Sequence, residues 1–566
     1  MGDDEYRHKW WGWGPEGVTY DMEGRPDFWD WIRKTAQIPD TPATTPPVSR
    51  ESFALPPRRK CPPFEQQITT RLSSNQLRVD DDDRLAHSYG RSYRDLVRLR
   101  AGIVDHPPDM VLYPESHEDV DQIMQLAVQH GVCLIPFGGG TNIVGCVEPS
   151  VSNNRVVATV DMRRMARVLH LDRESQTAIL EPGMFGPQVE AALNKLGYSL
   201  GHHPDSFVYS TVGGWIATRS AGTQSNVYGK IEDMVVAIRM VTPCGTIQTK
   251  PLPAASNGPD LNRMVAGSEG TLGIITEATM RVHPMPEYEE YRLLLFPSFE
   301  QGYQAIYHCV QAGWMPSLAR LSDEAETDLM FAAKHPVKGL KKLIQDWGKR
   351  LLKARGYTKP AALVVAFEGP QKKTQWLRKE VLKCCRSYKG FDLGVGAGEA
   401  WKKSRYDVPY LRDYLMDYGA IADSFETSTM WANMMPLYQS VTAAVRRAVE
   451  QVTGRRYYYL GCHISHLYQT GACLYYTVAV RAKEGSTPDQ MISQYAAIKE
   501  AATDEIMRCG GALSHHHAIG YEHQPWIEQE LSSTGVKAIR AVKTALDPTG
   551  ILNPGSLIPQ EPTRVP

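Results

Sequence analysis

Four absences narrow what this chain can be before any motif is considered. The sequence contains no run of about 18 apolar residues, which a membrane-spanning helix requires. Its ten cysteines form no Cys-x-x-Cys pair, so we expect the reduced thiols of an intracellular protein, without a disulfide framework or a zinc site. A formal net charge of −1 argues against a nucleic-acid partner held by bulk electrostatics. The N-terminal residues form no secretory signal.

A nucleotide-binding fingerprint of the Rossmann type is also missing. No Gly-x-Gly-x-x-Gly segment opens a helix with an acidic residue about 20 positions further on. Instead, residues 136–142 (Pro-Phe-Gly-Gly-Gly-Thr-Asn) follow a short apolar run at 133–135. Glycines reach positive φ and let several N–H groups converge on an anion, so this turn can bind a pyrophosphate. By itself the segment is equally consistent with an ordinary tight turn.

The length and the order of predicted elements indicate a large enzyme of several domains. At about 150 residues per domain, 566 residues correspond to three or four units, and the composition is ordinary for a globular protein. Short β-like runs alternate with helical segments from about residue 107, and a long α+β region follows residue 286. We predict strands at 111–113, 133–136, 156–160, 177–180, 234–241 and 291–296, helices at 117–130 and 188–196, and a hairpin turn at 242–245. The predicted divisions are an N-terminal wrapping and helical region (1–104, irregular over 1–60), a cofactor domain (105–286), a substrate or cap domain (287–535) and a C-terminal return with a tail (536–566).

Two further small-residue segments, 210–218 and 267–276, complete a pattern with the glycine turn. In this order the three segments resemble the FAD-binding domain of the vanillyl-alcohol oxidase or p-cresol methylhydroxylase type. The resemblance implies an α+β fold, in which a two-part FAD-binding domain carries an α+β cap and residues 546–555 return to the flavin. The residues it implies at the cofactor are Pro136, Gly138, Gly139, Gly140, Thr141, Asn142, Asp205, Ser210, Thr211, Gly213, Gly214, Thr218, Ser220, Glu269, Gly270, Thr271, Gly273 and Ile275. We expect non-covalent FAD, because Thr141 stands where covalently flavinylated relatives have a Gly-Gly-His pattern.

Within that superfamily, five blocks resemble the alkyldihydroxyacetonephosphate synthases. They are residues 9–14, 222–233, 424–428, 471–475 and 514–517. The resemblance implies the ether-forming step of ether-lipid synthesis, in which the acyl group of acyl-dihydroxyacetone phosphate is exchanged for a fatty alcohol and a fatty acid is released. It implies a covalent flavin N5 adduct without net redox change. It also implies a homodimer in the peroxisome or glycosome, although residues 563–566 do not match a Ser-Lys-Leu address.

Two arginines are candidates for the substrate site. Arg412 is similar to the arginine that clamps the substrate phosphate in this family, and a planar guanidinium suits a phosphate dianion. The alternative is a surface charge pair with Asp413. Arg320 lies between apolar residues at period two, so it can point into a pocket from a strand, and it resembles the arginine beside the flavin. Its alternative is an outward-facing charge on the strand.

The acid-base candidates are Tyr475 and the histidine run. Tyr475 matches the essential tyrosine of the family, while Tyr476 should face the other side of a strand; without the match, an aromatic there would be read as core. A phenol with a pKa of about 10 needs a partner, and we place His517 foremost, supported by His516 and His515, because histidine titrates near neutral pH. A metal site or a tag-like run is the alternative, but adjacent residues rarely converge on one metal, so we predict none.

Two further features leave alternatives open. His463 and His466 have a zinc-like spacing if helical, but their surroundings are strand-like, which predicts opposite faces and no metal. Residues 337–356 form an amphipathic pattern with a basic face, which is typical of a helix on an anionic membrane surface and equally of a helix docked on the protein. The apolar positions are Leu340, Leu343, Ile344, Trp347 and Leu351.

Two other function classes remain compatible with this fold. An FAD-dependent 2-hydroxy-acid or alcohol dehydrogenase or oxidase would share the cofactor domain but would cycle the redox state of the flavin. An inactive lipid-binding protein would not need Arg320, Arg412, Tyr475 and His517 together.

Overall fold

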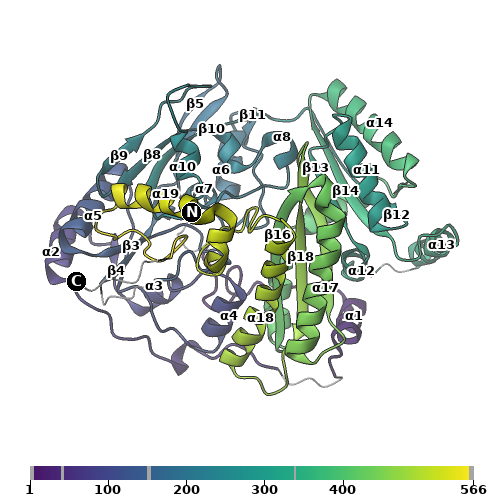
Figure 1. Ribbon diagram of the computed structural model, residues 1–566, viewed down its shortest axis with the longest axis horizontal. Coiled ribbons are helices and arrows are strands. Elements are labelled where there is room, and N and C mark those ends of the chain that lie inside the picture. The colour runs from purple at the N-terminus through teal and green to yellow at the C-terminus, as the bar shows by residue number, and fades with distance from the viewer. Residues whose placement is uncertain (1–5, 40–43, 150–154, 337–338, 560–566) are drawn as a thin grey trace.

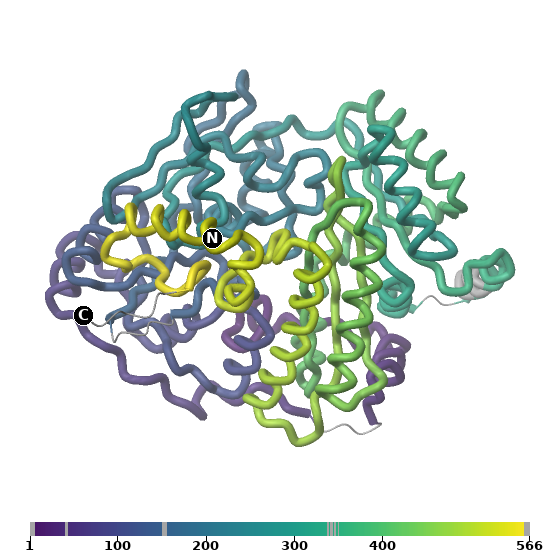
Figure 2. The backbone as a smooth tube through the Cα atoms, in the orientation of Figure 1, coloured from purple at the N-terminus to yellow at the C-terminus, as the bar shows by residue number. Residues whose placement is uncertain are grey.

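The computed structural model describes residues 6–39, 44–149, 155–336 and 339–559. Two bodies of sheets and helices lie side by side, the first built mainly from the N-terminal half and the second from the C-terminal half (Figure 1). The tube in Figure 2 shows the chain returning from the second body to the first near its C-terminal end. In the described part of the chain, no helix is long and apolar enough to cross a membrane.

The N-terminal region wraps around both bodies, as expected, but it is not irregular throughout. Helix α1 lies within residues 1–60, and a proline is its first residue. Its residues Phe28 and Ile32 lie one turn apart on one face and pack against Leu329 and Leu411 of the second body, which stabilises the helix. The elements of this region are α1 (Pro26–Ala36), η1 (Arg50–Ser52), α2 (Pro62–Arg71), β1 (Leu77–Arg78), α3 (Asp81–Ala86) and α4 (Tyr93–Arg100). The expectation of irregular structure over residues 1–60 is therefore wrong for α1.

The first body contains a four-stranded sheet of order β1-β2-β4-β3 and a five-stranded sheet of order β5-β6-β10-β8-β9. Its elements are β2 (Met110–Leu112), α5 (His117–His130), β3 (Cys133–Phe137), β4 (Val157–Asp161), η2 (Met162–Arg164), β5 (Val168–Asp172), β6 (Thr177–Leu180), α6 (Gly186–Asn194), β7 (Tyr198–Ser199), α7 (Val212–Thr218), α8 (Ser225–Tyr228), α9 (Ile231–Met234), β8 (Val235–Thr242), β9 (Gly245–Gln248), α10 (Leu261–Val265), β10 (Ile274–Arg281) and β11 (His283–Pro284). Strands β2, β4 and β3 are parallel, so the glycine turn leaves the carboxyl end of β3. The predicted hairpin joins β8 to β9.

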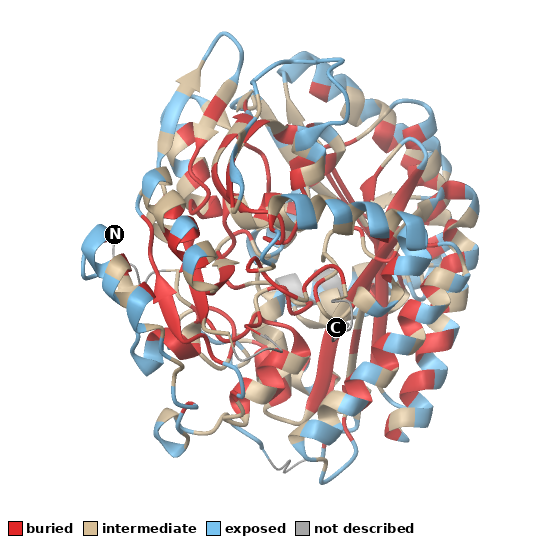
Figure 3. Ribbon diagram, turned by 60° about the vertical axis from the view of Figure 1, so that its left-hand side comes forward, coloured by how far each residue is buried: buried red, intermediate tan, exposed pale blue. Residues whose placement is uncertain are grey.

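The second body is built on an antiparallel seven-stranded sheet of order β15-β12-β14-β13-β17-β18-β16. Its elements are β12 (Tyr288–Phe296), α11 (Phe299–Gln311), β13 (Leu318–Ser322), α12 (Glu324–Ala332), α13 (Leu340–Ala354), β14 (Ala361–Gly369), α14 (Gln371–Ser387), β15 (Phe391–Asp392), α15 (Val395–Ser404), α16 (Val408–Met416), β16 (Ala420–Met430), η3 (Trp431–Asn433), α17 (Met434–Thr453), β17 (Tyr459–Leu467), β18 (Gly471–Arg481) and α18 (Pro488–Arg508). Helices α11, α14, α17 and α18 cover one face with the largest apolar core, while exposed residues gather on the outer helices (Figure 3).

The C-terminal segment returns to the first body through η4 (Gln524–Trp526) and α19 (Ile527–Leu546). Leu552 then bridges to Leu134 of β3, and the Asn553 side-chain amide donates to the carbonyls of Cys146 and Glu269. The end of the chain is therefore built into the strand that carries the glycine turn. The predicted domain bounds stay predictions, although the second sheet begins at Tyr288, next to the boundary placed after residue 286.

Candidate functional site

A cavity of about 1030 Å³ lies between the two bodies. The first body contributes the glycine turn and the segments 204–223 and 268–275, and the second contributes the face of its sheet opposite α11, α14, α17 and α18. Two more walls come from helix α1 and from the end of α12. The cavity is large for a single ligand site, since pockets for small molecules usually measure about 300–1000 Å³. It can hold a dinucleotide and leave room for a second ligand.

The glycine turn has no space for side chains. A Cβ on Gly139 would lie 1.6 Å from the Tyr209 carbonyl oxygen, and one on Gly138 would lie 2.3 Å from Thr211 Oγ1. Gly140 has a φ of +68°, which side-chain-bearing residues rarely adopt. The backbone therefore approaches the 209–211 segment closely and exposes its polar groups to the cavity. These features fit a site that receives a pyrophosphate.

The predicted cofactor residues line this cavity with one exception. Thr271 is buried outside it, where its hydroxyl donates to the Ser268 carbonyl, so its placement at the cofactor is not supported. Glu269 lies at the wall, but its carboxylate accepts the N–H groups of Ile519 and Gly520 and the hydroxyl of Ser556. That side chain therefore fastens the C-terminal segments to the first body.

Arg320 points from β13 into the cavity, as its spacing predicted, and belongs to a buried charge cluster. Its guanidinium donates to Glu326 Oε1 at 2.6 Å, and His463 Nδ1 lies 3.0 Å from Glu326 Oε2. Burial would raise the pKa of Glu326, but His463 and Arg320 lower it to about 2. Glu326 therefore stays ionised and holds the arginine in place. Sequence reasoning missed it, because no motif surrounds it.

Tyr475 lies on β18 among three histidines. Its ring stacks on His463 and on His516, with centroid separations of 4.9 and 5.8 Å, and meets the edge of the His517 ring at 5.3 Å. Its hydroxyl lies 2.7 Å from Ser424 Oγ. Burial raises the pKa of Tyr475, so the phenol is protonated at neutral pH. Tyr476 faces the covered side of the sheet, as predicted from strand alternation.

The histidine run is held by one buried carboxylate. Glu426 on β16 accepts the N–H groups of His515, His516 and His517 at 2.7, 2.9 and 2.9 Å. Burial would raise the pKa of Glu426, but the three histidines and the hydrogen bonds keep it well below its usual range. Burial also lowers the pKa values of His516 and His517 to about 3 and about 4. Both imidazoles are thus neutral near pH 7, which differs from the expected titration near neutrality.

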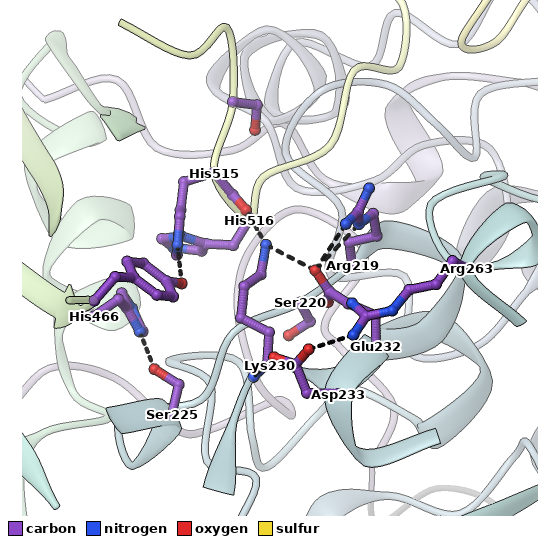
Figure 4. Close-up of polar contacts among 12 residues, drawn as sticks. Arg219, Ser220, Ser225, Lys230, Glu232, Asp233, Arg263, His466, His515 and His516 are labelled. Atoms are coloured by element: carbon purple, nitrogen blue, oxygen red, sulfur yellow. Dashed lines mark hydrogen bonds and ion pairs between the residues drawn. The ribbon is translucent and has the colours of Figure 1, made fainter. Parts of the chain in front are cut away.

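The three histidines do not share one environment. His516 and His517 line the cavity, whereas His515 does not and instead has Nε2 at 2.6 Å from the Tyr468 hydroxyl. Figure 4 shows Lys230 reaching this loop from the first body. Its ammonium donates to the His515 carbonyl oxygen at 2.6 Å and lies 3.4 Å from Glu232. His515 is therefore a part of the frame of the site, and Lys230, whose role the sequence did not indicate, fixes it from behind.

The expectation that His463 and His466 lie on opposite faces is wrong. The pairing of β17 with β18 shifts register between Ser465 and Leu467, and His466 has a φ of +49°. This bulge turns His466 to the side that His463 already occupies, and both line the cavity. His466 Nδ1 lies 2.7 Å from Ser225 Oγ, so the ring joins the two bodies (Figure 4). Alternation of side chains along a strand predicts the face of the sheet to which each one points only where the pairing with the neighbouring strand is regular.

Arg412 lines the cavity from α16 and is not paired with its neighbour. Asp413 instead lies 3.2 Å from Lys9 Nζ and accepts the Trp13 N–H at 2.6 Å. Arg412 Nη1 donates to the Arg91 carbonyl, and its buried Nε finds no acceptor among the residues that the structure describes. A guanidinium with an unused donor at a cavity wall can bind an anion. The N-terminal segment around Trp13 thus shapes the arginine's surroundings, a contact that spans 400 residues of sequence.

Comparison with known proteins agrees with this geometry. The family models "FAD binding domain" and "FAD linked oxidases, C-terminal domain" match residues 108–250 and 285–557. The chain is 38% identical to the alkyldihydroxyacetonephosphate synthase of Trypanosoma brucei brucei over 98% of its length and 93% of that protein. It is 38% identical to the synthase of Dictyostelium discoideum over 94% of its length and 88% of that protein.

Solved structures give the same result. A structure of alkyldihydroxyacetonephosphate synthase superposes with a TM-score of 0.84 and 34% identity, covering 98% of this chain and all of that one. A p-cresol methylhydroxylase structure shares the fold at a TM-score of 0.66 and 16% identity, covering 87% of this chain and 96% of that one. The predicted α+β class and the FAD-binding domain are confirmed. This chain belongs to the alkyldihydroxyacetonephosphate synthase family.

Proposed function

We propose that this enzyme exchanges the acyl group of acyl-dihydroxyacetone phosphate for a fatty alcohol, which forms the ether bond of an ether lipid. One observation supports the proposal: the glycine turn, Arg412, Tyr475 and the loop that carries the three histidines (residues 514–517, the histidine loop) border a single cavity. The cavity also extends to apolar residues of α1 and α12. In the reaction the carboxylate leaves the carbon beside the ketone and the alcohol oxygen takes its place. The proton of the alcohol balances the departing carboxylate.

The residues of the first body would hold FAD without a covalent bond. The glycine turn and Thr141 would receive the pyrophosphate, and segments 210–218 and 267–276 would flank the rest of the cofactor. When bound, the flavin supplies an electrophilic centre that retains the dihydroxyacetone phosphate unit while one chain leaves and the other arrives. Acid precipitation of the protein should therefore leave the yellow colour in the supernatant. Flavin fluorescence on the denatured band would contradict non-covalent binding.

Side chains of the second body would handle the phosphate and the protons. Arg412 would bind the phosphate through its unused donor, and Arg320 would stay oriented through Glu326. The neutral imidazoles of His516 and His517 can accept a proton from the carbon beside the ketone or from the alcohol, and Tyr475 can pass one on through its hydroxyl. The lowered pKa values keep both imidazoles unprotonated at neutral pH, so each is free to accept a proton, and the neighbouring Glu426 carboxylate stabilises the charged ring that forms.

The apolar end of the cavity supports a fatty substrate and an entry from a membrane surface. Ile32, Ile38 and Leu329 line this end, and helix α13 follows shortly after α12. On α13, Leu343, Trp347 and Leu351 recur every four residues and are 66%, 69% and 38% exposed. The helix projects from the side of the molecule (Figure 1). Leu352 at the end of α13 packs against the core of the second body, whereas the three exposed residues offer an apolar stripe that fits insertion into a lipid surface. The side chains of Leu340 and Ile344 lie outside the described residues.

One assay tests the reaction. The FAD-loaded enzyme is incubated with acyl-dihydroxyacetone phosphate and labelled fatty alcohol, and we expect labelled alkyl product with one fatty acid released per turnover. The flavin absorbance should return to its starting value after the substrates are consumed. Net bleaching of the flavin without alkyl product would instead indicate the dehydrogenase or oxidase class, to which the matched "FAD linked oxidases" family is related by name.

The cellular site and the subunit state stay predictions. The family resemblance implies a peroxisome or glycosome and a homodimer, and residues 563–566 lie outside the described part of the chain. Microscopy of the tagged full chain and sedimentation of the purified enzyme would test the two expectations separately.

A further inference from the structure

The histidine loop meets a thiol that the proposed reaction does not use. Cys473 lies on β18, two residues before Tyr475, and is fully buried. Its sulfur, an oxygen of Glu426 and one nitrogen each of His515 and His516 all lie within 4.8 Å of one another. These four groups come from two strands and from the loop that Glu426 holds. Three of them are buried, and His516 opens to the cavity.

This set of donors suits a transition-metal ion. Thiolate sulfur and imidazole nitrogen are the usual ligands of zinc, with bonds of about 2.0–2.3 Å. In a tetrahedral site such bonds place the ligand atoms about 3.3–3.8 Å apart. The more distant donors would thus have to move about 1 Å closer, while the two imidazole nitrogens that lie 2.8 Å apart would have to separate slightly, and the short loop at 514–517 can accommodate both shifts more easily than a regular strand. Hard cations such as magnesium prefer oxygen ligands and would gain little here.

The hydrogen bonds of the two rings show where an ion would bind. His515 Nδ1 and His516 Nδ1 are 2.8 Å apart, so one of these nitrogens carries a proton that the other accepts. His515 Nε2 already has the Tyr468 hydroxyl as a partner and can hold a proton if Nδ1 gives it up. An ion between the two Nδ1 atoms would therefore replace the shared proton through a change of tautomer. The Cys473 thiol would release its own proton to solvent on binding.

The charges balance around such an ion. A Cys473 thiolate and the Glu426 carboxylate together carry two negative charges, which offset a divalent cation, and the nearby Lys230 ammonium is paired with Glu232. Glu426 already accepts N–H groups of the loop, so it would act mainly through its charge while the sulfur and the two imidazoles form the bonds. The fourth position would face the cavity beside His516.

We propose that Glu426, Cys473, His515 and His516 form a zinc-binding site, and that bound zinc reversibly inactivates the enzyme. The ion would occupy the nitrogen atoms of the loop and move the His516 ring from its stack on Tyr475. A proton could then no longer pass between these groups. The inhibitory part rests on the proposed function, whereas the binding site does not.

Calorimetry tests binding independently of turnover. Titration of zinc chloride into the FAD-loaded full chain should show one ion per chain, and magnesium chloride should give no binding. Cys473→Ser keeps the size of the side chain but removes the soft ligand, and we expect its zinc affinity to fall by more than about tenfold. Cys462→Ser is the matched control, because this buried thiol on the neighbouring strand packs into the core on the covered face. It should bind zinc like the parent.

The activity assay tests the inhibitory part. Zinc should inhibit the parent and Cys462→Ser, a chelator should restore turnover, and Cys473→Ser should turn over without zinc and resist inhibition. Circular dichroism and retained flavin verify that each variant is folded. Equal zinc binding by Cys473→Ser and the parent, or no binding at micromolar zinc, would overturn the site. Binding without inhibition in an active enzyme would overturn the inhibitory role, and an inactive parent that still binds zinc would indicate failure of the proposed function alone.

Discussion

The two bodies that enclose the cavity build their walls from different parts of the chain. The first body presents backbone, packed so closely that a Cβ on Gly139 would overlap the Tyr209 carbonyl. The second presents side chains whose positions depend on charged partners far away in sequence, such as Glu326 for Arg320 and Glu426 for the histidine loop. A backbone site can be changed by adding one carbon atom. A side-chain site is changed by removing a partner that never touches the substrate.

The largest expected effect is on the second body. Tyr475→Phe and His517→Ala should each lower turnover by about 10²–10⁴-fold, the usual contribution of acid-base groups, because their rings meet at 5.3 Å and act on the same proton. Bound FAD should stay at the parental level. Steady-state rates and the flavin-to-protein ratio provide the two measurements.

The double variant sharpens this test. If the two groups work as a unit, Tyr475→Phe with His517→Ala should cost scarcely more than either change alone. Losses that multiply would place the two residues in separate steps and remove the proton relay from the proposal.

The matching change in the first body is Gly139→Ala. Because the added Cβ would lie 1.6 Å from a backbone oxygen, the glycine turn must move, and we expect loss of FAD and, with it, of turnover. Flavin absorbance after gel filtration measures the loss. Gly396→Ala in α15 is the control, because its Cβ would meet no atom within 4 Å. Retention of FAD by Gly139→Ala would contradict a backbone-defined cradle.

This comparison also explains what the sequence could predict. The helix at 117–130 and the strand that precedes the glycine turn were found because their patterns are local. The glycine turn was found for the same reason, since adjacent residues supply the whole feature. The strand alternation that separates Tyr475 from Tyr476 was also sufficient.

The missed features share a physical cause. Glu326 contacts His463 across 137 residues of sequence, and Lys230 contacts His515 across 285. No periodicity or local motif encodes such a pairing. The bulge at His466 and the docking of α1 depend in the same way on neighbouring elements. The placement of Thr271 at the cofactor stays a prediction, and its hydroxyl, which donates to the Ser268 carbonyl, shows that a matched segment does not fix where each of its side chains points.

Arg412→Lys should have the next largest effect. A lysine is a point charge that cannot reproduce a planar two-pronged contact, and loss of one charged hydrogen bond costs about 1.5–3 kcal/mol, or about 10- to 150-fold. The loss should appear in the KM for acyl-dihydroxyacetone phosphate, with the KM for fatty alcohol nearly unchanged. An equal change for both substrates would make Arg412 a structural residue. Kinetics with each substrate varied in turn separate these outcomes.

Lys230→Met tests whether a residue of the first body positions the side chains of the second. The loop would lose the hydrogen bond to the His515 carbonyl but keep those to Glu426, so we expect kcat to fall by about tenfold with KM and bound FAD unchanged. Lys230→Arg should restore part of the rate, because it can still donate. Lys402→Met, which removes a partly exposed pair with Glu289 and a contact with the Tyr291 ring but no contact with the histidine loop, is the control and should leave the rate unchanged.

Substitutions on α13 should have the smallest effect on turnover, because the described residues of this helix do not line the cavity. Trp347→Ser should weaken binding to anionic vesicles at all salt concentrations, because salt does not screen the contribution of an inserted apolar side chain. Turnover on detergent-dispersed substrate should stay at the parental level. Reversing Lys341, Lys342, Lys349 and Arg350 to glutamate should also weaken vesicle binding, by about 1 kcal/mol for each residue near the surface, but mainly at low salt. Trp376→Ser on α14 is the matched control, since this tryptophan is 54% exposed yet lies outside the stripe. Vesicle co-sedimentation that is unchanged in the α13 variants would mean that the fatty chains enter the cavity from another side.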